Sequence, residues 1–232
     1  MPAPETTRRI FLVRHGETLY GANTGGKDDL TPAGYKQIEA LEVMLRPTTL
    51  DAIYASPLER AQATARTLAG LSGVPVTTIP DLREITPGDL SVLSAPTAEG
   101  VAGFLRQAIG YFVDPETRWD TKYLGGESYR ELRARVWPFF RELIARDDWR
   151  RVLVVAHGGV NNAILGRILG TAEPGLANLE QDFGGLNIID VVADRPVLRL
   201  LNFTAYDPLK SDLETSSMDV LRAILETSLG VG

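Results

Sequence analysis

The sequence predicts an α/β fold, a three-layer sandwich in which helices flank both faces of a mostly parallel central sheet. Short runs rich in Val, Ile and Leu alternate with longer segments of helical spacing, as in strands joined by crossover helices. Several of these runs lead directly into helix-start signals such as Thr-Pro and Ser-Pro. The length of 232 residues, with 44% hydrophobic and 23% charged residues, suits a single globular domain over residues 1–232.

Three short strands and two helices are expected in the first third of the chain. The strands are apolar or β-branched runs, and each helix begins with a hydroxyl residue followed by Pro at the first helical position. Thr31 and Ser56 are the expected N-caps. The expected elements are a strand over 9–13, a helix over 32–45, a strand over 52–55, a helix over 57–71 and a strand over 76–79.

The rest of the chain continues this alternation and ends in a hairpin and a helix. Pro138 lies inside a long helical segment, which we expect it to kink or divide. Residues 193–196 join two strand-like runs, so the hairpin adds antiparallel strands at the edge of the sheet. The irregular stretch 88–126 is interpreted as an insertion over the active site. The expected elements are helices over 98–112, 127–146, 158–169 and 217–229, and strands over 152–156, 187–192 and 197–202.

The composition argues against several classes of partner. A net charge of −6 and a pI near 5.1 disfavour a nucleic-acid surface, which needs basic patches. Cysteine is absent, which excludes disulfides, thiolate nucleophiles and cysteine metal sites. No apolar run approaches the roughly 20 residues that cross a bilayer, and the first residues lack the pattern of a secretion signal. We therefore expect a cytoplasmic protein without a membrane or nucleic-acid partner.

Each of the two histidines in the chain follows a strand-like run and precedes a glycine. His15 lies in IFLVRHGET and His157 in VLVVAHGGV. Because the carboxyl ends of parallel strands present ligand groups at one edge of a sheet, we expect the two imidazoles in one cleft. Arg14 directly precedes His15, where a guanidinium without an anion is expensive to desolvate. Either histidine alone could equally well end a core strand with a backbone partner.

Two charged residues extend this candidate site. Arg60 lies one turn into the helix that follows the second strand, which favours a site role over a solvated helical arginine. Glu84 lies in the segment LREI, where apolar neighbours favour the protonated form; the alternative is a surface carboxylate paired with Arg83. Guanidinium groups, imidazoles and glycine N–H groups together suit a tetrahedral dianion. Phosphate is therefore the expected ligand.

Four separated motifs occur in an order that resembles the histidine phosphatase superfamily, whose fold is phosphoglycerate-mutase-like. They are LVRHGET, YASPLERAQATA, LREI, and GGES with VVAHGGV, and they span about residues 10–202. The resemblance implies that His15 is the nucleophile and Glu84 the proton donor. It also implies a phosphate pocket formed by Arg14, Arg60 and His157. The implied activity is metal-independent hydrolysis of a small phosphorylated metabolite through a phosphohistidine.

The sequence departs from the mutase branch in the loop after the first motif. Mutases carry a Trp-Asn pair there, whereas this chain has Gly21 where the Asn would fall, and Asn23 or Thr24 could substitute from a shifted position. Thr18 is a candidate supporting hydroxyl, Glu17 is left undecided, and Gly158 with Gly159 is expected to permit a tight turn after the second histidine. Because the missing residues help to orient a bisphosphate ligand in mutases, we expect hydrolysis rather than return of the phosphoryl group.

Two alternatives to hydrolysis and two absences complete the expectations. Phosphoglycerate mutase-type transfer is the second reading, and a regulatory protein that binds a phospho-ligand without turnover is the third, although this chain retains His15 and Glu84. No metal or other cofactor is expected, because two histidines, no cysteine and no clustered acidic motif leave no ligand set. A homodimer is compatible with the apolar helix faces. The sequence does not select the substrate.

Overall fold

The computed structural model describes residues 7–18, 29–70, 72–88, 119–171 and 179–211. Within them, six strands form one sheet in the order β3-β2-β4-β1-β5-β6. The strands are β1 (Arg8–Arg14), β2 (Ala52–Ala55), β3 (Val76–Thr78), β4 (Arg151–Ala156), β5 (Leu186–Val192) and β6 (Arg195–Phe203). The first four run parallel, and β5 and β6 are antiparallel to their neighbours. The predicted α/β class with a mostly parallel sheet is confirmed.

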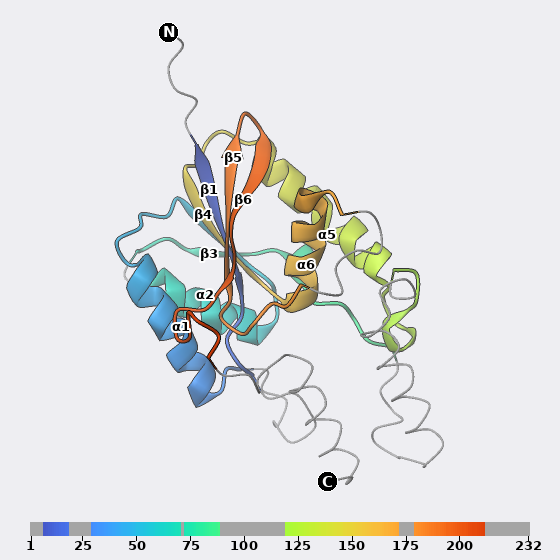
Figure 1. Cartoon of the computed structure of the whole chain (residues 1–232), viewed down its shortest axis with the longest axis horizontal. Helices are drawn as coiled ribbons and strands as arrows, with labels where there is room; N and C mark the ends of the chain where they lie inside the picture. The colour runs from blue at the N-terminus through green and yellow to red at the C-terminus, as the bar shows by residue number, and fades with distance from the viewer. Residues whose placement is uncertain (1–6, 19–28, 71, 89–118, 172–178, 212–232) are drawn as a thin grey trace.

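Helices cover both faces of this sheet, as Figure 1 shows. Helices α1 (Pro32–Leu45) and α2 (Glu59–Ala69) lie on one face, and α5 (Tyr129–Ala145) and α6 (Gly158–Leu169) lie on the other. Two short 3₁₀ turns, Pro80–Leu82 and Tyr123–Gly125, lie in the connections.

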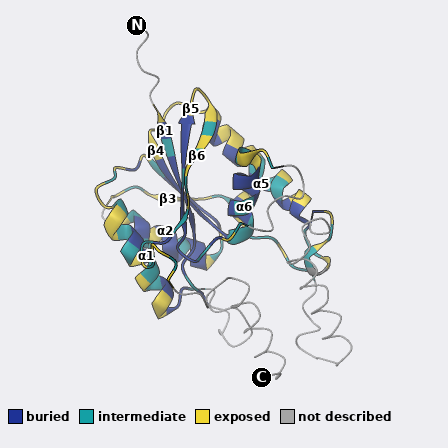
Figure 2. Cartoon of the chain, in the orientation of Figure 1, coloured by how far each residue is buried: buried dark blue, intermediate teal, exposed yellow. Residues whose placement is uncertain are grey.

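The central strands are buried on both faces, which explains their continuous apolar sequences. In β1, Ile10 and Leu12 belong to the core beneath α5 and α6, whereas Phe11 and Val13 belong to the core beneath α1 and α2. Successive side chains of a strand point to opposite faces, so one run supplies both cores. Figure 2 shows this buried centre surrounded by helices whose outer faces are exposed.

Most predicted boundaries agree with the structure, but α2 begins later than expected. Thr31 caps α1 through a hydrogen bond from Gly34 N–H to its hydroxyl, as predicted. Helix α2 starts at Glu59 after Leu58, without a side-chain cap, so the expected start after Ser56 is wrong. The hydroxyl of Ser56 is instead used by His157, as described below.

Two further predictions need correction. Pro138 does not divide the long helix: α5 is continuous from 129 to 145. This helix begins with a capping box formed by Ser128 and Glu131. The final hairpin is present, but its turn is shorter than residues 193–196: Ala193 and Asp194 alone have positive φ, and β6 begins at the next residue. Of the two hairpin strands, only β6 lies at an edge of the sheet, because β5 pairs with β1 as well.

Some expectations concern segments that the structure does not describe. The predicted helices 98–112 and 217–229 and residues 89–118 of the expected insertion 88–126 lie outside the described residues. Among the described helices, none has the length and apolarity that a membrane crossing requires.

The chain segment after β1 packs closely against α1. A Cβ atom on Gly34 would lie 2.2 Å from the carbonyl oxygen of Glu17, and one on Gly16 would lie 2.7 Å from that of Gly34. Any other residue at either position would therefore push the two backbones apart. These glycines allow α1 to approach the turn that follows His15.

Candidate active site

The pairing of β1 with β4 brings the two histidines together. Arg14 and Ala156 are partners in the parallel ladder, so the residues that follow them leave the sheet side by side. The His15 amide donates to the carbonyl of Ala156 at 3.1 Å, and the two imidazole centroids are 5.0 Å apart. Both side chains are almost completely buried, at 1% and 0% exposure. The expected meeting of the two rings is therefore observed.

The hydrogen bonds of His15 define which ring nitrogen is available to react. Nδ1 lies 2.7 Å from the carbonyl oxygen of Gly16, which can only accept, so Nδ1 carries the hydrogen. Arg60 Nε donates to the other nitrogen, Nε2, at 3.2 Å. Nε2 therefore carries the lone pair and faces the guanidinium of Arg60.

Burial and neighbouring cations keep both imidazoles neutral. Burial lowers the pKa of His15 well below its ordinary value, and His157, Arg60 and Arg14 lower it further. Burial also lowers the pKa of His157, with smaller contributions from Arg60, Arg14 and Arg135. A neutral imidazole has a lone pair at neutral pH, as a nucleophile requires.

Arg14 and Arg60 hold their positive charges inside the protein. Both residues are less than 10% exposed. Arg60 is the second residue of α2, nearer the start of the helix than the expected position one turn into it, and its carbonyl accepts from the Thr64 hydroxyl, which in turn accepts from Gly16 N–H at 3.1 Å. Arg14 stacks on the ring of Phe183 with its Cζ 3.9 Å from the centroid, and it donates to the carbonyl of Gln181. Each guanidinium is thus supported by a separate part of the fold.

A buried amide network lies behind Arg14. Asn187, in β5, donates to the side-chain oxygen of Gln181 at 2.8 Å and to the carbonyl of Leu12 at 3.2 Å. Its own side-chain oxygen accepts from the Asn202 amide at 2.9 Å. Sequence reasoning did not identify this network, although an Asn inside the apolar run of β5 was a usable signal.

His157 is oriented by Ser56, a residue that the sequence suggested only as a helix cap. The Ser56 hydroxyl lies 2.7 Å from His157 Nε2, and both side chains are fully buried. The same hydroxyl accepts from the Leu58 amide at 3.3 Å. His157 Nδ1 has no hydrogen-bond partner within the described residues, so it is available to a ligand.

The carboxyl group of Glu84 lies beside the N-terminal end of α6, where it contacts Gly159, the second residue after His157. Its Oε2 accepts from Gly159 N–H at 3.1 Å and its Oε1 from Ile85 N–H at 2.8 Å. Arg83 donates to Thr86 instead, and no ion pair of Glu84 occurs among the described residues. The alternative of a surface Glu84–Arg83 pair is therefore wrong for this structure.

The remaining predicted pocket residues have different positions. Thr18 is buried, and its hydroxyl donates to the carbonyl of Asp29 at 2.6 Å, which connects the end of the segment after β1 to the residues before α1. Gly158 begins α6, and a Cβ there would lie 3.6 Å from Arg14 Nε. Neither Gly158 nor Gly159 has a positive φ, so the turn after His157 does not use a left-handed glycine. Asn23 and Thr24 lie outside the described residues.

The described residues contain no cluster of three or more His, Asp or Glu side chains that could hold a metal ion. The site instead combines two buried guanidinium groups with the first turn of α6, whose N–H groups carry partial positive charge. Such a site can bind a tetrahedral anion close to Nε2 of His15.

The sequence is similar to that of known phosphatases and of a phosphoglycerate mutase. The family profile described as "Histidine phosphatase superfamily (branch 1)" matches residues 10–204. The adenosylcobalamin/α-ribazole phosphatase of Escherichia coli K12 is 29% identical over 207 residues, covering 85% of this chain and 97% of that protein. A 2,3-bisphosphoglycerate-dependent phosphoglycerate mutase of Brucella melitensis is 31% identical over 208 residues, covering 83% and 98%.

A solved structure has a similar overall fold. The mycobacterial glucosyl-3-phosphoglycerate phosphatase in complex with inorganic phosphate superimposes with a TM-score of 0.69 at 26% identity. The match covers 85% of this chain and 98% of that one.

We predict that stability falls as the pH decreases below about 6.5, the ordinary pKa of histidine. The unfolded chain then binds protons that the folded chain excludes from both imidazoles, whose pKa values are lowered. Each histidine contributes a slope of up to about 1.4 kcal/mol per pH unit, whereas above that pH both states are neutral and the contribution vanishes. Urea unfolding of the wild type and of a His15→Asn/His157→Asn variant measures this slope. Equal slopes in the two proteins would contradict the prediction.

We predict that Ser56→Ala disturbs His157 and weakens the binding of inorganic phosphate by about ten-fold, the effect of one buried hydrogen bond. Calorimetry gives the affinity, and ¹⁵N NMR reports the state of the ring, since only two histidines contribute signals. Ser72→Ala is the matched control, because the exposed Ser72 hydroxyl accepts a similar bond from Val74 N–H at 3.3 Å but contacts no histidine. Equal effects of the two substitutions would show that the contact with His157 has no positioning role.

Proposed function

Because the chain belongs to branch 1 of the histidine phosphatase superfamily and is a phosphoric monoester hydrolase, we propose that it cleaves small phosphorylated metabolites through a phosphohistidine on His15. The observation that carries this proposal is the neutral, buried His15, whose Nε2 lone pair faces Arg60. The same ring lies beside the imidazole of His157, which is the N-cap residue of α6.

In the first step, Nε2 of His15 attacks phosphorus and the bond to the leaving oxygen breaks. Arg60 must move its N–H from Nε2 to a phosphate oxygen, so substrate binding uncovers the lone pair. Phosphorylation places positive charge on the imidazole, and the Gly16 carbonyl stabilises it through Nδ1–H. Arg14, Arg60 and His157 hold the equatorial oxygens while bonds to phosphorus loosen.

Glu84 completes the reaction as acid and then as base. As an acid it donates a proton to the departing alkoxide, which leaves as an alcohol. As a carboxylate it then accepts a proton from water, whose oxygen attacks the phosphohistidine and releases inorganic phosphate and the Nε2 lone pair. The hydrogen bond from Gly159 supports this role, because it keeps Glu84 beside the helix that begins at His157. No step uses a metal ion.

Phosphoryl transfer between two hydroxyl groups is the second candidate function. The similarity to the Brucella melitensis mutase favours it, because the match covers 83% of this chain and 98% of that protein at 31% identity. A mutase returns the phosphoryl group from histidine to a second hydroxyl, whereas a phosphatase gives it to water. Phosphorus NMR of a reaction with 3-phosphoglycerate separates these outcomes: a positional isomer supports transfer, and free phosphate supports hydrolysis.

The relatives suggest the first substrates to test. We propose a panel that contains α-ribazole 5′-phosphate, glucosyl-3-phosphoglycerate, 3-phosphoglycerate and phosphoserine, since similar proteins are named as phosphatases of three of these compounds or as a mutase of the fourth. Release of inorganic phosphate is the readout. All four compounds contain a phosphomonoester group and differ in the alcohol to which it is attached, so the rates identify the class of alcohol that the site accepts.

We predict that His15→Ala lowers kcat by roughly 10³-fold or more with an aryl phosphate, because the variant lacks the nucleophile. Wild-type protein treated with radiolabelled substrate should carry an acid-labile, alkali-stable phosphoryl group, and His15→Ala should carry none. His157→Ala is the matched control, since it loses the same side chain but retains the label at a reduced rate. Labelling of His15→Ala, or loss of wild-type activity in EDTA, would refute the mechanism.

We predict that Glu84→Gln reduces kcat/KM by about 100-fold with alkyl phosphates but by less than about 10-fold with p-nitrophenyl phosphate, whose leaving group needs little protonation. The control is Glu59→Gln, which makes the same chemical change at an exposed residue of α2 paired with Arg66. It should leave both rates near wild type. If Glu84→Gln slowed both substrates equally, the carboxyl group would not be the acid.

A further inference from the structure

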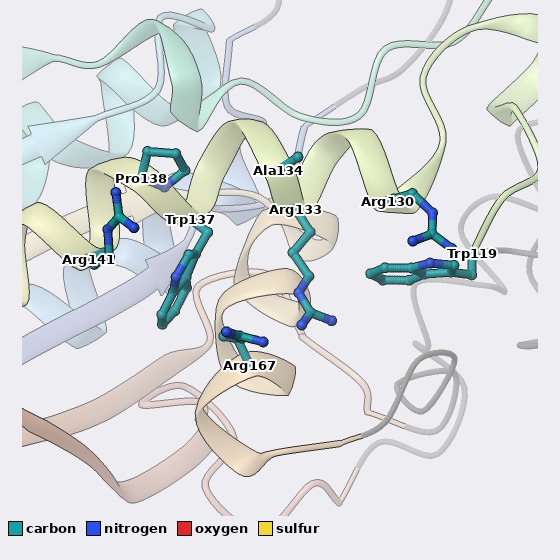
Figure 3. Close-up of a pocket in the computed structure, with 8 residues that line it drawn as sticks. All are labelled: Trp119, Arg130, Arg133, Ala134, Trp137, Pro138, Arg141 and Arg167. Carbon is teal, nitrogen blue, oxygen red and sulfur yellow. The ribbon is translucent and has the colours of Figure 1, made fainter.

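We propose that the outer groove between α5 and α6 is a second ligand site, which binds a small organic anion with several negative charges. Figure 3 shows this groove, where side chains from one flank of α5 meet Arg167 of α6. The cavity has a volume of about 240 Å³. Its charged and aromatic lining consists of Trp119, Arg130, Arg133, Trp137, Arg141 and Arg167. We call it the arginine groove.

The arginine groove lies along one flank of α5, where this helix meets Arg167 of α6. Arg130, Arg133, Trp137 and Arg141 recur at intervals of three or four residues, so they share one face of the helix. The side chains that α5 buries most deeply lie on a neighbouring stretch of the helix surface: Leu132, Val136, Phe140 and Leu143. None of the groove residues belongs to the site built around His15. The two sites are therefore separate surfaces of the same domain.

Positive charge is concentrated in this groove, although the protein as a whole has a net charge of −6. Four guanidinium groups line one small cavity. Arg130 pairs with the exposed Asp120 at 2.6 Å, but Arg141 and Arg167 have no ion pair among the described residues. The positive charges of Arg141 and Arg167 are therefore not offset by an ion pair among these residues, and an anion that binds in the groove would be attracted to them.

The two tryptophans hold the arginines in position for a ligand. Arg130 and Arg133 each lie with Cζ 5.1 Å from the centroid of the Trp119 ring, and Arg167 lies 5.5 Å from that of Trp137. Stacking uses the face of a guanidinium and leaves the N–H groups around its edge able to bind oxygens. The ordered side chains therefore lose less conformational entropy when an anion binds.

The rest of the lining indicates what the anion is attached to. Ala134 and Pro138 contribute apolar surface beside the Trp137 ring. A water molecule occupies about 30 Å³ in the liquid, so the cavity has room for more than a bare anion and its hydration. Arginine favours planar carboxylate and phosphate groups, which it binds in a bidentate manner. A compact apolar or planar body that carries two or three such groups fits these features.

The experiment uses benzene-1,3,5-tricarboxylate as the probe, because it has a planar apolar body, three carboxylates and no bond that a phosphatase cleaves. Trp119 and Trp137 line the groove and Trp149 does not, so a ligand in the groove changes the surroundings of two of the three tryptophans and intrinsic fluorescence reports its binding. We expect a saturable change in wild-type fluorescence. Arg167→Gln should weaken the affinity by about ten-fold or more, the effect of one charge-assisted contact, while hydrolysis of an aryl phosphate stays within two-fold of wild type.

Arg66→Gln is the matched control, since it removes the same charge from the exposed surface of α2. The proposal is overturned if the probe gives no saturable signal, or if Arg66→Gln and Arg167→Gln weaken binding equally. It is also overturned if the probe acts as a competitive inhibitor of hydrolysis with an unchanged constant in Arg167→Gln, because the probe then occupies the pocket of His15. The fluorescence titration needs no turnover, so it remains decisive even if the phosphohistidine mechanism fails.

Discussion

The parallel register between β1 and β4 is the constraint on which the candidate site depends. It sets Arg14 opposite Ala156, so that His15 and His157 leave the sheet together. Both strands are apolar on each face, and a shift by one residue would exchange the two cores and turn Arg14 to the other side of the sheet. The packing that stabilises the domain is therefore also what selects the geometry of the two imidazoles. No local feature of either histidine could achieve this alone.

Burial then gives these imidazoles their chemical character. The loss of water on burial and the positive charges of the neighbouring Arg60 and Arg14 keep the imidazole of His15 neutral. A more exposed site would hydrate the arginines and allow the histidines to bind protons. Holding two guanidinium groups inside the protein requires partners, which the carbonyl of Gln181, the ring of Phe183 and the nitrogen of His15 provide. The network through Asn187 connects this support to β5, so the antiparallel strand contributes to the site as well as to the sheet.

Local signals in the sequence predicted much of this arrangement, and long-range contacts account for what they missed. The positions of His15 and His157 after buried strands, and the presence of Arg60 on the helix that follows the second strand, were predicted from hydrophobic periodicity. The contact between Ser56 and His157 was not predicted. A serine before a proline has the same local pattern whether it caps a helix or contacts a ring 101 positions away. The Ser56 hydroxyl contacts His157 instead of capping a helix, and α2 begins without a side-chain cap. The bonds of Gln181 and Asn187 are likewise set by the pairing of distant strands, which propensity does not encode.

The start of α6 shows why the two glycines there matter for chemistry rather than for chain reversal. A Cβ on Gly159 would lie 2.5 Å from Oε1 of Glu84, so any side chain would displace the carboxyl group. Through its amide this residue donates to Glu84, and through its carbonyl it accepts from the Tyr129 hydroxyl at 3.0 Å, which joins α5 to the same turn. Gly158, the residue before it, lies next to the Arg14 side chain, since a Cβ atom there would be 3.6 Å from Arg14 Nε. One helical turn therefore positions a cation, an imidazole and a carboxyl group together, so that a phosphate held by the first two lies within a frame that also carries the proposed acid.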